Sequence, residues 1–166
     1  MKFLQVATFA WPDHFGGAER VIGEVTTRLA ARGHEVTLLT ARLGELPAAE
    51  RRDGVEVRRY AVDRGSPLAF YRSVFHGVRR ALRDPAAAGA DVLHVHQILS
   101  GIAALAPGGA RLPAMLSFYA PYHQEFLARF REGRGEGEVP PRAALLSALM
   151  KHGDRHLLRR CKQVQS

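Results

Sequence analysis

Cysteine is nearly absent from this sequence, because Cys161 is the only one in 166 residues. A single cysteine cannot form an internal disulfide, so the fold must be held by its apolar core, and the composition suits a reducing compartment. Long hydrophobic runs are missing too, and none approaches the ~20 residues that span a bilayer. With 46% apolar residues at this length, we expect one soluble cytoplasmic domain.

Lysine is scarce, although the chain is strongly basic. Only three of the 24 basic residues are lysines, and the formal net charge is +8. The excess of arginine indicates a compositional bias, so a solvated basic surface explains most of the charge. The alternatives are attraction to anionic lipid, to phosphorylated substrates or to nucleic acid. Nucleic acid is the weakest of these, because the sequence has no zinc-finger, RNP-like or helix-turn-helix motif.

Several sequence signatures of catalysis are missing as well. The chain has no G-x-G-x-x-G fingerprint and no Walker A motif, which argues against a dinucleotide or P-loop site. It has no G-x-S-x-G elbow, and Cys161 lies in a basic C-terminal segment, so nucleophilic hydrolase chemistry is disfavoured. The predicted strand ends offer glycines and histidines where a Mg²⁺-dependent receiver domain would need paired aspartates.

His94 and His96 stand two residues apart in a predicted strand, so both imidazoles could reach one ion. A zinc site normally needs three or four protein ligands, and no nearby cysteine or further carboxylate completes one. We therefore expect no metal site, with His94 packed within the sheet and His96 exposed at the end of the strand.

What the sequence does contain is a regular alternation of two apolar patterns. Short apolar runs are followed by segments whose apolar residues recur every three to four positions, which is typical of amphipathic helices. Strands are predicted over 2–10, 35–41, 55–60, 91–96 and 113–118, and helices over 17–32, 66–82 and 98–106. The alternation predicts an α/β fold, a doubly wound parallel sheet with helices on both faces and strand order 3-2-1-4-5.

Beyond Tyr122 the pattern is helical, with one interruption over 132–142. The interruption holds three spaced glycines and two prolines, which predicts a mobile loop. The basic segment from Leu149 to Arg160 is either a solvated helix face or a surface that docks on anionic membrane. The sequence pattern predicts the start of another strand where the chain stops, so we expect residues 1–166 to be one Rossmann-like domain cut from a longer protein.

Two adjacent glycines, Gly16 and Gly17, separate the first predicted strand from the first predicted helix. They either permit a tight turn or let a ligand approach the backbone, where the free N–H groups of a helix N-terminus favour an anion. In the predicted strand order, strands one and four are neighbours at the point where the order reverses. Gly16, Gly17, His96 and Gln97 would therefore line one crevice at the carboxyl ends of these strands.

The stretch GGAERVIGEVTTRLAARGHEVTLLTA, followed by DVLHVH, resembles the N-terminal, acceptor-side half of the group 1 (family 4) glycosyltransferases of the GT-B fold. The resemblance covers nearly the whole chain. It implies a retaining transfer of sugar from a nucleotide-sugar to a saccharide, lipid-linked or small-molecule acceptor, without a cofactor or an obligatory metal. It also implies a second, nucleotide-binding half with an acidic motif that this chain lacks, so we expect the chain alone to be inactive.

The resemblance implies roles for particular residues. Gly16 and Gly17 would lie beside the donor phosphates and the reacting centre, and the candidate catalytic residues are His96 and Tyr119. The expected acceptor-binding residues are His14, Gln97, Tyr122 and His123. One departure stands out, because Tyr119 occupies the position where many relatives carry a histidine after the fifth strand.

The departure leaves three possibilities open: His123 substitutes for that histidine, Tyr119 supplies a hydrogen bond, or the site differs. The rival hypothesis for the whole chain is a free-standing Rossmann-like ligand-binding or regulatory domain without catalysis. A third hypothesis is an interaction module at the inner face of a membrane, which is compatible with transfer to a lipid-linked acceptor.

Overall fold

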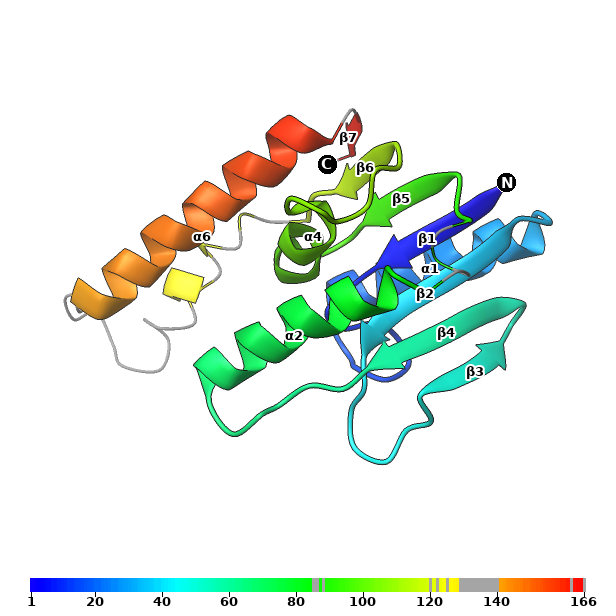
Figure 1. The fold of residues 1–166 in the computed structure, drawn as a ribbon, viewed down its shortest axis with the longest axis horizontal. Helices are drawn as coiled ribbons and strands as arrows, with labels where there is room; N and C mark the ends of the chain where they lie inside the picture. The colour runs from blue at the N-terminus through cyan, green and yellow to red at the C-terminus, as the bar shows by residue number, and fades with distance from the viewer. Residues whose placement is uncertain are drawn as a thin grey trace.

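The computed structural model describes residues 1–84, 87, 89–119, 121, 123–124, 126–128, 141–161 and 163–165. A seven-stranded sheet runs through this part of the chain in the order β3-β4-β2-β1-β5-β6-β7 (Figure 1). The strands are β1 (Lys2–Val6), β2 (Glu35–Ala41), β3 (Ala49–Arg52), β4 (Val55–Tyr60), β5 (Val92–Val95), β6 (Ala114–Ser117) and β7 (Gln163–Gln165). The helices are α1 (Gly17–Ala31), α2 (Pro67–Ala81), α4 (Ile98–Leu105) and α6 (Pro141–Arg160).

The predicted doubly wound order is confirmed. The five predicted strands appear as β1, β2, β4, β5 and β6, and their spatial order β4-β2-β1-β5-β6 is the expected 3-2-1-4-5. All of these neighbours are parallel, and Phe3 of β1 pairs with Val36 of β2 on one side and Val92 of β5 on the other. The strand expected at the C-terminus is also present, because β7 adds in parallel to β6.

The edge strand β3 is the element that the sequence interpretation missed. It pairs antiparallel to β4 through a two-residue turn, in which Asp53 and Gly54 have φ angles of 50° and 80°. Asp-Gly is the favoured pair for such a turn, because both central residues need a positive φ. The stretch AERR was missed because it has no β-branched or aromatic residue, although the Asp-Gly pair before VEVRRY was an available signal.

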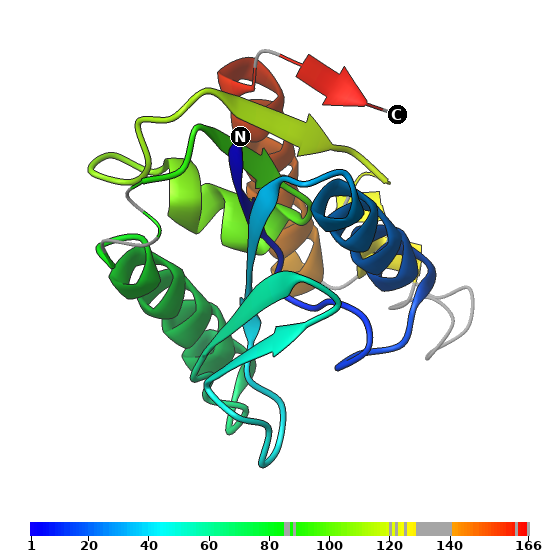
Figure 2. The same cartoon turned by 90° about the vertical axis from the view of Figure 1, so that its right-hand side faces the viewer.

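Helices cover both faces of the sheet, with α1 on one side and α2 and α4 on the other (Figure 2). The core has two parts accordingly. The smaller cluster lies under α1 and includes Ile22, Val36 and Leu38. The larger cluster lies under α2, α4 and α6 and includes Val74, Val95 and Leu157. Each fully buried side chain of this kind contributes roughly 1.5–3 kcal/mol relative to exposure.

The predicted ends of the helices are largely correct. Ser66 caps α2, since its hydroxyl accepts from the Ala69 N–H at 3.2 Å and Pro67 occupies the first helical position. Gly33 follows α1 with φ 82°. The first strand is shorter than the predicted 2–10, because it ends at Val6 and releases the chain into the loop before α1.

The C-terminal part was predicted less accurately. Of the expected loop over 132–142, residues 132–140 lie outside the described residues, whereas Pro141 already begins α6. No helix in the described part of the chain is both long and apolar enough to cross a membrane.

Candidate functional site

A cavity of about 360 Å³ opens at the carboxyl ends of β1, β5 and β6. The loop between β1 and α1 and the start of α1 form one wall, and the residues that follow β5 and β6 form the other. The lining residues are Thr8, Phe9, His14, Phe15, Gly16, Gly17, Ala18, Glu19, Phe70, His96, Gln97, Ile98, Leu99, Ser117, Phe118 and Tyr119. The cavity therefore lies at the predicted switch point and contains six of the eight predicted site residues.

The other two predicted residues do not join this set. Tyr122 lies outside the described residues. His123 is not among the lining residues, and its Nδ1 lies 2.7 Å from Oδ2 of the buried Asp154 in α6. The Ser147 hydroxyl of α6 also donates to the His123 carbonyl at 3.5 Å. His123 thus ties the segment after β6 to α6.

The Gly16–Gly17 pair is not required by the conformation of the backbone. Gly16 is extended, with φ −177° and ψ 168°, and neither glycine has a positive φ. A Cβ added to Gly17 would meet no atom within 4 Å, whereas one added to Gly16 would collide with the Glu19 carboxylate. Gly17 therefore leaves an open stretch of backbone on the wall of the cavity, at the helix end where N–H groups lack intrahelical partners.

Gln97 joins the two walls of the cavity. Its side-chain oxygen accepts from the Phe9 N–H at 2.8 Å, and its side-chain nitrogen donates to Glu19 at 3.1 Å. Its own carbonyl accepts from the Gly101 N–H at 2.9 Å and so helps to start α4. The predicted acceptor-binding residue Gln97 thus positions Phe9 and Glu19.

Glu19 is a site residue that the sequence analysis did not single out. Its side chain is 13% exposed and lies on the cavity wall, 3.7 Å from the His14 imidazole. The available signal was its place two residues after Gly17, on the first turn of the helix that begins at the cavity wall. A carboxylate at this point accepts hydrogen bonds from hydroxyl groups and opposes a second anion at the same spot.

A chain of hydrogen bonds supports Tyr119 from beneath the cavity. The Tyr119 hydroxyl lies 2.9 Å from His96 Nδ1, and His96 Nε2 lies 2.6 Å from the Gln5 side-chain oxygen. The Thr26 hydroxyl donates to the same Gln5 oxygen at 3.0 Å. With the Gln5 amide oxygen as its partner, His96 donates from Nε2 and accepts the phenol proton of Tyr119 at Nδ1.

His96 is buried, which corrects the prediction that it would be exposed at the end of its strand. It is 2% exposed, because its N–H still bonds to the Val6 carbonyl and its ring packs on His94 with centroids 3.9 Å apart. His94 is packed within the sheet as predicted, with Nε2 2.8 Å from the Ser117 hydroxyl. The position of His96 after a strand did not predict this burial, because the burial depends on contacts of its ring with Gln5 of β1 and with Tyr119 after β6.

Burial controls the protonation of these groups. Desolvation lowers the pKa of His94 to about 4, and desolvation together with the neighbouring His94 holds the pKa of His96 well below 6.5. Desolvation also raises the pKa of Tyr119, which is 38% exposed. At neutral pH both imidazoles are uncharged and Tyr119 keeps its proton, so this network orients a phenol and does not supply a strong base.

The sequence match decides the family. Residues 16–164 match the family described as Glycosyl transferase 4-like domain, which covers most of the chain. The chain belongs to this family. Domains of the family 4 glycosyltransferases bind, in general, a nucleotide-sugar donor and an acceptor. No curated protein matched the sequence in a separate comparison.

Solved structures show the same fold for this family 4 domain. Sucrose-phosphate synthase from Thermosynechococcus elongatus matches with a TM-score of 0.68 and 12% identity, over 98% of this chain and 41% of that chain. A shorter chain of the same enzyme matches with a TM-score of 0.53 and 11% identity, over 95% of this chain and 99% of that one. The doubly wound fold is therefore similar to part of a GT-B enzyme, and the chain spans less than half of the longer synthase chain.

Among the described residues, the lining of the cavity is aromatic and polar and includes no lysine or arginine. Phe9, Phe15, Phe70, Phe118 and Tyr119 supply ring faces, while Glu19, Gln97 and Ser117 supply hydrogen-bonding groups. Within the same part of the chain, no cluster of three histidine, cysteine or acidic residues could hold a metal ion. The lining therefore combines ring faces with hydrogen-bonding groups, as small-molecule sites commonly do.

Proposed function

We propose that this family 4 domain is the acceptor-binding half of a retaining glycosyltransferase. One observation carries the proposal: the open backbone at Gly17 and the oriented Tyr119 hydroxyl line the same cavity. The aromatic and polar lining offers ring faces and hydrogen-bonding groups to an acceptor sugar. The donor's nucleotide would be held by a second domain, as the family resemblance implies.

The start of α1 is the place for the donor's phosphate groups in this proposal. The N–H groups of Gly17 and Ala18 open a helix of 15 residues, whose dipole favours negative charge. The Glu19 carboxylate lies against Gly16 and is fixed by the hydrogen bond from Gln97, so it opposes an anion at Gly16 and leaves the backbone at Gly17 open. Phosphate oxygens would therefore approach at Gly17, and Glu19 would accept from acceptor hydroxyls.

Transfer with retention needs a group to take the proton of the acceptor hydroxyl. The pKa of the buried His96 is well below 6.5, which makes its imidazole a weak base, and Tyr119 is a protonated phenol, so neither is suited to take that proton. The departing phosphate oxygen takes the proton as the acceptor oxygen bonds to the anomeric carbon and the bond from that carbon to phosphate breaks. Tyr119 then contributes by hydrogen-bonding to a sugar hydroxyl near the reacting centre.

The test compares this chain with a longer protein in which it is joined to a nucleotide-sugar-binding half. We expect the chain alone to show no transfer above background with a panel of donors. The longer protein should form product whose anomeric configuration, read by NMR, matches that of the donor. Robust turnover by the chain alone, or an inverted product, would contradict the proposal. If neither the chain alone nor the longer protein transfers sugar, a free-standing binding domain explains the chain better.

A further inference from the structure

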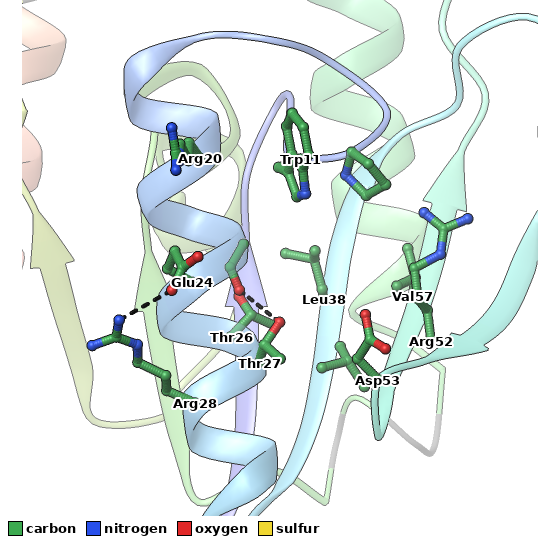
Figure 3. A pocket seen from close by; sticks show the side chains of 13 residues that line it. Trp11, Arg20, Glu24, Thr26, Thr27, Arg28, Leu38, Arg52, Asp53 and Val57 are labelled. Carbon is green, nitrogen blue, oxygen red and sulfur yellow. Dashed lines mark hydrogen bonds and ion pairs between the residues drawn. The ribbon is translucent and has the colours of Figure 1, made fainter.

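A second cavity of about 560 Å³ lies between α1 and the β3–β4 hairpin (Figure 3). It exists because α1 packs over β2 and part of β4 and leaves an open trough toward the hairpin. Leu38, Val55 and Val57 form its apolar floor, and polar residues of α1 and the hairpin form its rim. Among the described residues, it shares no lining residue with the cavity at Gly17.

Trp11, the only tryptophan of the chain, stands over this trough. It is 43% exposed, and Figure 3 shows its ring beside α1, with the indole nitrogen at the end nearer Leu38. The mid-helix Gly23 allows this position, because a Cβ there would come within 3.0–3.3 Å of three Trp11 atoms. A glycine inside a helix lowers stability by roughly 0.5–1 kcal/mol relative to alanine, and the close packing of Trp11 on Gly23 compensates for this loss.

The polar rim carries charges of both signs that are largely paired. Arg28 lies 3.2 Å from Glu24, and Arg52 lies 3.1 Å from Glu50. Asp53, at the hairpin turn, adds a carboxylate that Figure 3 shows turned into the space between the hairpin and α1. Arg20 also lines the cavity and has no ion-pair partner among the described residues, so the rim offers two paired guanidinium groups, one open guanidinium group and carboxylates, and can hydrogen-bond in both directions.

From this arrangement we propose that the second cavity binds a neutral saccharide, with one sugar face stacked on Trp11. Sugars have an apolar C–H face that packs on an indole and a rim of hydroxyls that donate to carboxylates and accept from guanidinium groups. The volume falls within the ~300–1,000 Å³ of typical ligand sites. The two cavities share no lining residue, but Trp11 packs edge to face on Phe15 of the first cavity with ring centroids 4.7 Å apart, so the test has to separate the two sites.

The single tryptophan makes the proposal directly testable. A ¹⁵N-labelled sample gives one indole N–H signal, which reports Trp11 alone. We expect maltose or cellobiose to shift this signal and to change the tryptophan fluorescence in a saturable way at millimolar concentrations. No saturable change with either disaccharide up to tens of millimolar would overturn the proposal, and so would the same response to inorganic phosphate alone.

Three variants show where the sugar binds. Gly23→Ala should push Trp11 aside by a few tenths of an ångström and weaken the apparent affinity several-fold, while circular dichroism checks that the fold is kept. Asp53→Gly removes the rim carboxylate without straining the positive φ, leaves Trp11 in place, and should weaken affinity several-fold.

Gly17→Val is the matched control, because it blocks the first cavity and touches none of the residues that line the second. The Trp11 response should be unchanged in this variant. Loss of the response in Gly17→Val would place the sugar in the first cavity. Full affinity in both Gly23→Ala and Asp53→Gly would refute the second site.

Discussion

Replacing Gly17 by alanine should raise the stability of the domain and lower the activity of the enzyme that contains it. Gly17 is the first residue of α1, its φ is not positive, and a Cβ there would meet no atom within 4 Å. At such a site, a change from glycine to alanine stabilises by roughly 0.4–1 kcal/mol, mainly by restricting the unfolded chain. For a domain of this size, that corresponds to a rise in Tm of about 1–4 °C.

The effect on activity should have the opposite sign. The added methyl group would project from the wall of the cavity where we place the donor phosphates. A displacement of about 1 Å at a reacting centre can cost ~100-fold in rate, so we expect kcat/KM to fall at least ten-fold. Gly17→Val should lower kcat/KM further and stabilise less than alanine does, because a β-branched residue is less favourable than alanine in a helix.

Thermal unfolding of the chain and a transfer assay of the longer enzyme measure the two effects separately. Gly101→Ala is the matched control, since a Cβ at Gly101 would collide with Val95 and crowd Leu157. We expect that variant to lose roughly 1–3 kcal/mol of stability. If Gly17→Ala left activity unchanged, or lost stability and activity together, the glycines would serve only the turn and the phosphate site would be refuted.

Three further predictions concern groups around the site. Tyr119→Phe should lower kcat/KM about ten-fold, the equivalent of ~1.4 kcal/mol for one hydrogen bond, and unchanged kinetics would remove Tyr119 from the reaction. The lowered pKa of His94 means that the unfolded chain binds the extra proton first, so stability should fall by roughly 3 kcal/mol as pH drops from 6.5 to about 4. Urea unfolding should show this slope reduced in His94→Gln, and an equal slope in both proteins would contradict the assignment. Asp13→Ala should cost about 2–4 kcal/mol in the same assay, because it removes a carboxylate partner of the buried Arg59 guanidinium, and a loss below 1 kcal/mol would refute that estimate of the pair.

Local chemistry was enough to predict most of the fold. Helical and strand spacing report which face of each segment is apolar, and Ser66-Pro67 and Gly33 mark helix ends through their own backbone preferences. Right-handed crossovers between parallel strands then leave few possible strand orders, so the position of the crevice could be predicted as well. The edge strand β3 was missed because its residues carry no apolar pattern and only its turn is distinctive.

The inner part of the site was decided by tertiary structure. Whether His96 faces solvent or a buried amide depends on the register of β1 against β5, which sets Gln5 opposite His94 and brings its side chain to His96. The register of β5 against β6 in turn brings His96, which follows β5, within hydrogen-bonding distance of Tyr119, which follows β6. Gln5 and His96 are 91 positions apart in the chain, and His96 and Tyr119 are 23 positions apart. A sequence pattern describes the faces of single elements, whereas protonation and orientation in this site follow from which side chains pack together across three strands.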